Sequence, residues 1–402
     1  LSGCREVLQL GPNAPSFAPD EAVRVDPGAA TPGSGRTWSE PARSIADAVG
    51  RSASGAADSA VVWLKEGVHL APPTAGLGLR IPQNLTLVGG FAGDESDPSG
   101  RRSSTGPTVL TFDRLGDDEL PGGSTDENAP RLAYTNSALS HSTPFVDPVE
   151  PPPSVPGVLL DRIDVRGSAG PGAATGGAAF TPACEVVRVQ DCTFEGVSGV
   201  FSLFDNFWNT PATFERTSFV GVEARLTNEP AAYRECLIAG CSSFSLLVWL
   251  DERGIRGTTV VGNSVSFGSV VHCSGAGPTA NVLRNVVLAD NASGNQAGVD
   301  AQIRFSDSGD PPDVGWSFIT DWTPGDGGVQ VLSGDPVFAD PLGPDGVPFS
   351  GDEDHAPGPG SPLIDAGGPR DEPAGSGLEE PAVDLRRLSR RALHPLGGAH
   401  EE

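Results

Sequence analysis

Between residues 158 and 292, short segments repeat the same order of apolar and polar residues. The first six positions of each segment are apolar, polar, variable, small, variable and apolar. In most segments the eighth and last position is a glycine. The five segments are Val189–Gly196, Phe214–Gly221, Tyr233–Gly240, Ile255–Gly262 and Leu283–Asp290. Their matching positions lie 25, 19, 22 and 28 residues apart, which is irregular but within the range of solenoid repeats. Residues 160–167, LDRIDVRG, read as one more repeat.

The aligned segments form four columns of residues. Three columns are apolar or small, and they hold Phe194, Phe219, Ile238, Val260 and Leu288; Cys192, Thr217, Cys236, Thr258 and Val286; and Val189, Phe214, Tyr233, Ile255 and Leu283. The fourth column is polar and is expected to face water: Gln190, Glu215, Arg234, Arg256 and Arg284. Side chains two positions apart on a strand share a face, so the first two columns are expected to face the core together. The third column is offset from the first by an odd number of residues, so the chain must bend near Asp191.

This repeat predicts an all-β protein: a single-stranded right-handed parallel β-helix of the pectate-lyase type with long loops. The 53 glycines and 38 prolines agree with it, because they supply turns and exclude long helices. A β-sandwich would need hairpin turns such as Asn-Gly, which are scarce here. Further strands are expected at residues 23–26, 60–64 and 85–88. Residues 41–49, PARSIADAV, have near-helical apolar spacing and are expected to form a short helix that caps the open end of the solenoid.

Composition divides the chain into three parts. Residues 1–22 read as a leader and linker, residues 23–334 as the β-helix, and residues 335–402 as a loop-rich tail packed on the solenoid. Inside the β-helix, residues 113–157 are acidic and proline-rich, which predicts a long excursion between two coils.

The chain carries 52 acidic and 26 basic residues, for a net charge of −26. Such a surface repels nucleic acid and anionic membranes, so partners of these classes are disfavoured. No apolar run has the length of a membrane span. The first four residues, Leu-Ser-Gly-Cys, match a bacterial lipobox, in which Cys4 carries a lipid and anchors a secreted protein to the outer membrane or cell surface. A chance tetrapeptide in a flexible leader is the alternative.

Several segments resemble a known group of proteins. The runs VRVDPGAATPGSGRTWSEPARSIADAV, VVWLKEGVH and LTLVGGFAGDE are similar to bacterial right-handed β-helix surface proteins related to polymorphic outer-membrane proteins, and so are the repeated CTFEG, SFVG and TTVVGNS. The run from Gly334 to Gly368, which contains GSPLIDAGG, and the later PLGGAHE resemble the C-terminal region of the choice-of-anchor Q group. The resemblance implies a fold and a cell-surface location. It implies no general activity.

The cysteines are expected to be mostly buried thiols. Cys192 and Cys236 share a column but lie two coils apart, so their Cα atoms are roughly 9.6 Å apart, beyond the ~7 Å limit of a disulfide. Cys184, Cys241 and Cys273 could find partners, but the five cysteines other than Cys4 cannot all pair.

An acidic, glycine-rich stretch of the tail is a candidate calcium site. Its carboxylates are supplied by Asp340, Asp345, Asp352 and Asp354. Interleaved carboxylates and glycines can wrap Ca²⁺. EF-hand spacing is absent, and loops in so acidic a chain are acidic by default, so an ordinary acidic loop is the alternative reading.

The polar column offers the candidate catalytic residues Glu215, Arg234, Glu235 and Arg256. Polysaccharide lyases of this fold need an arginine or lysine base beside calcium-binding carboxylates, and hydrolases need two neighbouring carboxylates. The arginines of the column form a basic ladder, with Asp251 and Glu252 in a nearby turn, and such a patch suits an acidic sugar. The alternative is a solvated charged face, and none of the local motifs of pectate lyases or polygalacturonases is present.

Aromatic residues mark a candidate ligand-binding site at Phe204, Phe207, Trp208 and Trp249. Exposed rings stack on sugars, so this region is the expected carbohydrate contact, with packing over the side of the solenoid as the alternative. We therefore expect a non-enzymatic cell-surface β-helix for adhesion, envelope structure or glycan binding. A lyase or hydrolase acting on acidic polysaccharide is the second hypothesis, and a subunit of an extracellular assembly is the third.

Overall fold

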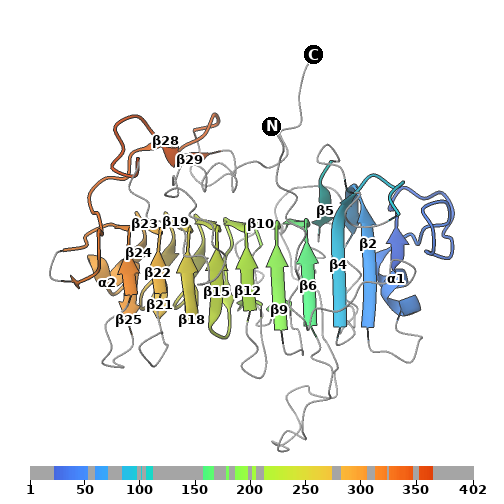
Figure 1. The fold of residues 1–402 in the computed structure, drawn as a ribbon, viewed down its shortest axis with the longest axis horizontal. Helices are drawn as coiled ribbons and strands as arrows, with labels where there is room; N and C mark the ends of the chain where they lie inside the picture. Colours follow the sequence, from blue (N-terminus) through green and yellow to red (C-terminus); the bar gives the residue numbers. More distant parts are fainter. Residues whose placement is uncertain are drawn as a thin grey trace, which may run out of the picture.

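A computed structural model describes residues 22–52, 59–70, 84–96, 101, 106–111, 157–166, 178–180, 186–197, 202–204, 212–273, 282–305, 313–323, 326–346 and 353–364. These residues form long parallel sheets that run along an elongated molecule, with very little helix (Figure 1). The molecule is therefore a parallel β-helix, as the repeat predicts.

The largest sheet, sheet 1, contains the strands that Figure 1 shows side by side. In spatial order its strands are β1 (Val23–Val25), β2 (Ser59–Lys65), β4 (Asn84–Phe91), β6 (Gly157–Asp161), β9 (Val186–Gln190), β12 (Ala212–Glu215), β15 (Ala231–Arg234), β18 (Val248–Arg256), β21 (Val271–Cys273) and β25 (Ile303–Phe305). Two further strands, β22 (Val282–Arg284) and β26 (Asp313–Gly315), continue the sheet from the second half of β18.

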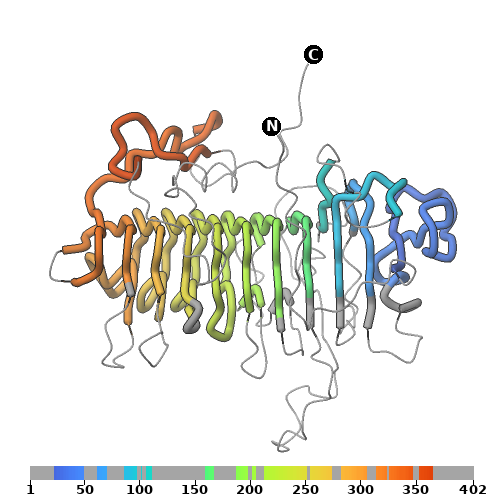
Figure 2. The backbone as a smooth tube through the Cα atoms, viewed as in Figure 1, coloured from blue at the N-terminus to red at the C-terminus, as the bar shows by residue number. Residues whose placement is uncertain are grey.

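Each strand of sheet 2 directly follows a strand of sheet 1 in the chain, so the coils are stacked in the same order in both sheets. Its strands are β3 (Gly67–Leu70), β5 (Thr108–Thr111), β7 (Asp164–Arg166), β10 (Thr193–Glu195), β13 (Ser218–Val220), β16 (Leu237–Ala239), β19 (Thr259–Val261), β23 (Val287–Ala289) and β27 (Phe318–Ile319). Two short sheets complete the coils. Sheet 3 holds β8 (Ala178–Phe180), β11 (Ser202–Phe204) and β14 (Arg225–Thr227), and sheet 4 holds β17 (Ser242–Ser243), β20 (Ser264–Val265) and β24 (Ala292–Ser293). The backbone trace shows the coils advancing along one axis with a right-handed turn (Figure 2).

The strand registers confirm the two columns of large apolar residues. Phe194, Phe219, Ile238, Val260 and Leu288 are successive partners in sheet 2. Val189, Phe214, Tyr233, Ile255 and Leu283 are successive partners in sheet 1. All of these side chains are fully buried in one continuous core. Within it, the rings of Phe194 and Phe219 stack with centroids 5.2 Å apart, and those of Phe214 and Tyr233 stack at 5.0 Å. The earlier repeat is also confirmed, because Val165 pairs with Phe194.

The expected bend near Asp191 is a corner that recurs in successive coils. One residue per coil there has a left-handed backbone: Arg162, Asp191, Arg216, Glu235, Gly257, Asn285 and Trp316, with φ between 46° and 56°. Ile163 and Val286 follow two of these corners. After the other five, the side chain of Cys192, Thr217, Cys236, Thr258 or Ser317 hydrogen-bonds the carbonyl two positions earlier, as Thr217 Oγ1 does to Glu215 O at 3.0 Å. The left-handed conformation costs a non-glycine residue roughly 1 kcal/mol, and these bonds together with inter-coil backbone bonds stabilise it.

A helix closes the N-terminal end, as expected, but it begins later than the pattern predicts. Helix α1 spans Ile45–Ser52, and Ile45 and Ala48 lie in the core. Residue 42 is not helical because Ala42 pairs with Val25 as a strand, with its N–H 2.8 Å from Arg24 O. Ser44 then caps the helix by accepting a hydrogen bond from the backbone N–H of Asp47.

The C-terminal segment covers the outward side of sheet 2 in the last coils. That side is apolar, and its buried residues are Val220, Leu237, Ala239, Val261, Val287, Ala289 and Phe318. Leu363 and the half-buried Phe338 pack on this stripe. Phe338 belongs to strand β28 (Phe338–Asp340), which pairs antiparallel with β29 (Asp354–Pro357) above sheet 2 (Figure 1). Within the described part of the chain, no helix is long and apolar enough to cross a membrane.

Candidate functional site

One outward-facing column of sheet 1 runs the length of the solenoid. Its residues, in register from the N-terminal coil, are Arg24, Trp63, Val88, Asp161, Gln190, Glu215, Arg234, Arg256, Arg284 and Gly315. The first half of this column is buried, from Arg24 to Gln190, and the column reaches solvent from Glu215 to Arg284. The expectation that the polar column faces water is therefore wrong for Gln190, which is only 2% exposed.

The buried half is a structural stack of aromatic and charged groups. The guanidinium of Arg24 lies 4.8 Å from the ring centroid of Trp63, whose ring stacks on Phe91 at 4.9 Å. Arg101 follows over Phe91 at 5.7 Å, and its Nη1 lies 2.8 Å from Oδ2 of Asp161. Both arginines lie against aromatic rings, and Arg101 also pairs with a buried carboxylate, so this half of the column is part of the packing.

In the middle of the column, charges of opposite sign neutralise one another. Arg216 Nε lies 2.7 Å from Asp191 Oδ1, and Arg216 Nη2 lies 2.9 Å from Asp191 Oδ2. Glu215 lies between Arg216, at 3.9 Å, and Arg234, at 3.7 Å. Glu235 occupies the corner of the next coil, with its N–H bonded to Arg256 O at 2.9 Å. The structure thus brings the four candidate catalytic residues, Glu215, Arg234, Glu235 and Arg256, onto three adjacent coils.

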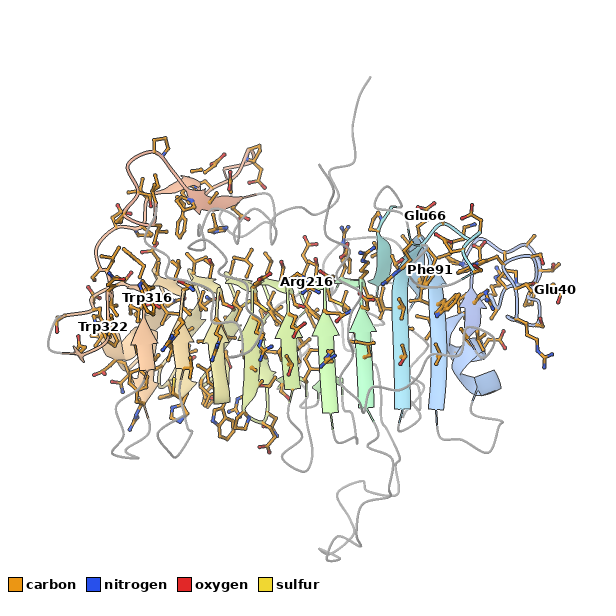
Figure 3. All side chains as sticks on the ribbon, in the orientation of Figure 1. Glu40, Glu66, Phe91, Arg216, Trp316 and Trp322 are labelled. Carbon is orange, nitrogen blue, oxygen red and sulfur yellow. The ribbon has the colours of Figure 1, made fainter. Side chains whose placement is uncertain are left out.

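The column then becomes cationic. We name Arg234, Arg256 and Arg284 the arginine ladder, because they are register partners on neighbouring strands. The corners beside Arg256 and Arg284 are uncharged, at Gly257 and Asn285. The guanidinium of Arg284 lies 5.5 Å from the ring centroid of Trp316. Figure 3 shows Arg216 and Trp316 along the same edge of the solenoid, on either side of the ladder.

Strand β18 carries a bulge just before the ladder. Its register with β15 shifts between Ala231 and Tyr233, and the extra residues are Asp251–Gly254. Gly254 has a φ of 67°, and a Cβ there would lie 2.0 Å from Val282 O, so only glycine fits. The expectation of a turn at Asp251 and Glu252 is wrong, since both lie inside the strand, and their side chains are outside the described residues.

Below the bulge, a second outward column crosses sheet 1. Trp249 pairs with His272, and His272 pairs with Arg304. The rings of Trp249 and His272 meet edge to face at 6.4 Å, and Trp249 is half-buried. Burial lowers the pKa of His272, and the charge of Arg304 lowers it further. Trp249 therefore lies on the same sheet as the ladder, at the other end of the strand.

The predicted aromatic site is not assembled as expected. Phe204 is 1% exposed and packs in the core, with its ring 5.5 Å from Phe194 and 5.2 Å from Phe214. It is therefore unavailable to a ligand, because the outward-facing loop position assumed from the sequence is an inward position of β11. Phe207 and Trp208 lie outside the described residues. Instead, the strongly exposed aromatic side chains of the described residues are Phe244 and Phe267, at 69% and 51%. The sequence offers one signal for them, since each follows a serine in a segment without charged residues.

The carboxyl groups with a raised pKa lie away from the ladder. Burial raises the pKa of Asp164, on the outward side of β7. Burial and the nearby Asp335 raise the pKa of Asp290, at the corner that follows β23. Neither group faces the arginine ladder. A glycosidase general acid needs such a raised pKa beside a second carboxylate at the sugar, and among the described residues the ladder lacks this arrangement.

The structure describes three of the four candidate calcium ligands of the tail. Asp340 and Asp354 are register partners across β28 and β29, and both are exposed. Asp345 is exposed in the following turn, and Asp352 lies outside the described residues. Over the described ranges, no three His, Cys, Asp or Glu side chains gather in a way that would hold a metal ion. Calcium binding remains a prediction.

The described cysteines are buried free thiols: Cys192, Cys236, Cys241 and Cys273. The expected absence of a Cys192–Cys236 bridge is confirmed. Burial raises the pKa of Cys236 and of Cys241 to about 12. Cys4, the expected lipidation site, and Cys184 lie outside the described residues.

Comparison of the chain with family models, with curated proteins and with solved structures finds no match. The family resemblance of the sequence is therefore supported only at the level of the fold, and the site is the remaining indication of function.

Proposed function

We propose that the protein is a non-enzymatic extracellular β-helix that binds an anionic polysaccharide along the arginine ladder. The observation that carries the proposal is the in-register stacking of Arg234, Arg256 and Arg284 on adjacent strands. At the strand spacing of about 4.8 Å, two like charges repel by roughly 1 kcal/mol in water. A polyanion lying across the strands would relieve that repulsion.

The contrast with the preceding coils supports a ligand with negative charge. Asp191 neutralises Arg216 there in a two-point contact, and Glu215 lies between two guanidinium groups. The corner after Arg234 is Glu235, but the corners after Arg256 and Arg284 are the uncharged Gly257 and Asn285, although the chain as a whole is strongly acidic. Arginine is suited to this role, because its planar guanidinium matches the two oxygens of a carboxylate or sulfate. Trp316 holds Arg284 in place through its ring.

We propose binding without cleavage, since the described side chains of the ladder do not form the arrangement of acid and base that cleavage requires. Glu215 is engaged by two arginines, which is the environment of an ion pair. The second hypothesis, a lyase or hydrolase, requires a carboxylate pair or a calcium site facing the same sugar. We keep it as an outcome of the test.

We further propose that the protein belongs to the cell-surface β-helix proteins it resembles in sequence, and that Cys4 is its lipid anchor. The support is the lipobox-like Leu-Ser-Gly-Cys and the GSPLIDAGG segment of the tail. Palmitate labelling of the full chain in a bacterial host, compared with Cys4→Ser, tests the anchor. Loss of label in Cys4→Ser supports it, and equal labelling of both chains refutes it.

The ladder is tested by calorimetric titration with polygalacturonate. The matched variants are Arg256→Gln with Arg284→Gln, and Arg166→Gln as control. Arg166 is exposed on sheet 2 and pairs with Glu195 at 3.5 Å, away from the ladder. The proposal expects saturable binding that weakens at least tenfold in the double variant and stays unchanged in the control. Equal affinity of all three proteins contradicts it.

The same samples, with and without calcium, are then assayed for unsaturated and reducing ends. The proposal expects none above the polysaccharide blank. If product forms with the wild type but not with Glu215→Gln, the result contradicts the binding hypothesis and supports the enzymatic one.

A further inference from the structure

Two exposed phenylalanines form a pair on neighbouring coils, beside sheet 4. Phe244 follows β17 and Phe267 follows β20, and their ring centroids lie 5.1 Å apart with an interplanar angle of 61°. They are 69% and 51% exposed. Large apolar side chains that are exposed together are a stronger sign of an interaction surface than ones that are exposed singly.

The backbone holds this pair in a fixed arrangement. Ser266 N–H bonds to Ser243 O at 3.0 Å, and Phe267 N–H bonds to Phe244 O at 3.1 Å. On the next coil, Asn295 accepts a hydrogen bond from Gly268 N at 2.8 Å through its Oδ1. A ligand therefore meets a preformed surface and little ordering entropy is lost on binding.

The surroundings of the pair are polar but uncharged over three coils. Residues 241–250, 262–271 and 291–299 contain no Asp, Glu, Lys or Arg, in a chain of net charge −26. The coil before them contributes Glu223, which pairs with Ser242, and Arg225, whose Nη2 donates to Ser245 Oγ at 2.6 Å. On the third coil the nearest described charge is at Asp300, whose backbone carbonyl accepts a hydrogen bond from Ser269 Oγ.

We propose that Phe244 and Phe267 form a binding site for a neutral glycan, separate from the arginine ladder. The apolar face of a pyranose ring packs on one phenyl ring, and the tilted second ring closes one side of it. Sugar hydroxyls then reach the serine and asparagine side chains at the border, since a binding site combines apolar contact with a few placed polar groups. An anionic sugar gains nothing here, because no described cation lies on these three coils beside the rings.

A protein partner fits this surface less well. Two half-exposed phenyl rings offer roughly 200 Å² of apolar surface, whereas a stable protein interface needs about 800 Å² from each partner. A second copy of the chain would also bring another 26 negative charges close to the first. A single sugar ring is of the right size for the pair.

The test is a titration of the full chain with cellohexaose and with chitohexaose, followed by calorimetry and by NMR of the sugar protons. We expect millimolar or tighter binding of at least one, with at least a tenfold loss in Phe244→Ala and in Phe267→Ala. The Arg256→Gln/Arg284→Gln protein should bind these neutral sugars like the wild type, so a failure of this site and a failure of the ladder are distinguishable. Unchanged thermal unfolding of Phe244→Ala shows that the variant is folded.

Two results would overturn the proposal. One is that the wild type binds neither oligosaccharide, or that the phenylalanine variants bind as tightly as the wild type. The other is concentration-dependent self-association of the wild type in sedimentation that Phe244→Ala abolishes, which would assign the pair to an interface between copies.

Discussion

Arg216 contacts Asp191 of the preceding coil through two hydrogen bonds, Nε to Oδ1 at 2.7 Å and Nη2 to Oδ2 at 2.9 Å. Both residues have a left-handed backbone, with φ of 48° and 51°. The pair joins two successive corners of the solenoid and neutralises the charges next to Glu215. Arg234, the first arginine of the ladder, follows Glu215 in the column, with its Nη1 3.7 Å from Glu215 Oε1.

Asp191→Asn should therefore destabilise the protein by about 1 kcal/mol. Asparagine keeps the side-chain size and tolerates the left-handed backbone, so the change removes mainly the charge. The magnitude stays small because both side chains are about one third exposed, where screening by water limits an ion pair. Urea unfolding measures it. Glu195→Gln, which removes the longer and more exposed pair with Arg166, is the control and should change stability by less than about 0.5 kcal/mol. Equal effects of both variants would contradict this account.

A buried amide ladder stabilises the second corner of the last coils. Asn263 donates to Ile238 O at 3.0 Å and to Asn291 Oδ1 at 2.9 Å, and it accepts from Cys241 N at 2.8 Å. Asn263→Ala should cost about 2–4 kcal/mol in unfolding free energy, because it leaves buried backbone groups without partners. Asn295→Ala, at an exposed position, should cost less than about 1 kcal/mol. A loss below 1 kcal/mol in Asn263→Ala would show that the ladder is dispensable.

The four described thiols should be unreactive in the folded protein. Burial raises the pKa of each, to about 12 for Cys236 and Cys241, so the thiolate that reacts is almost absent at pH 8. Alkylation with iodoacetamide, mapped by peptide mass spectrometry, should leave Cys192, Cys236, Cys241 and Cys273 unmodified until denaturant is added. Modification of any of them under native conditions at the rate of a free thiol would disagree with their burial.

The C-terminal segment should loosen as the pH falls. Burial lowers the pKa of His355, and the opposing effect of Glu353 and Asp354 is smaller. Since the folded ring resists protonation, its contribution to stability is complete above the ordinary value of 6.5 and is lost as the pH falls through and below that value. Hydrogen exchange at Phe338–Asp340 and Asp354–Pro357, corrected for the intrinsic rate, should therefore rise between pH 7.5 and pH 5.

His355→Asn provides the control for that experiment. The variant cannot titrate in this range, so its protection should change less with pH, even though losing the contact with Phe338, at 5.4 Å between rings, lowers it overall. The same pH dependence in the variant and the wild type would assign the effect to other groups.

The sequence predicts the core columns well because each inward position takes the same kind of apolar or small side chain in successive coils. Phe219 is the register partner of Phe194 and Ile238 in the neighbouring coils, so its column is visible from the spacing of the repeats. The outward column is different. Asp161 is buried because it pairs with Arg101, sixty residues earlier in the chain. The local sequence around Asp161 does not indicate a contact with so distant a residue.

The aromatic residues show the same limit. Phe204 and Phe244 both stand near coil corners in the sequence, but Phe204 points inward from β11 and Phe244 points outward after β17. One residue of register decides between core and surface, and irregular coil lengths hide that register. The bulge in β18 is hidden for a similar reason, because Asp251–Gly254 has the composition of a turn.

The most direct test of the central proposal is the salt dependence of polygalacturonate binding to the wild type and to Arg256→Gln/Arg284→Gln, with product release followed in the same samples. If the ladder binds the polyanion, affinity falls steeply with salt, and the slope against log salt concentration is shallower in the double variant by roughly one to two, since each lost contact releases one fewer counterion. No new chain ends accumulate. Binding with the same slope in both proteins, or chain ends that accumulate with time, would contradict a non-enzymatic arginine ladder.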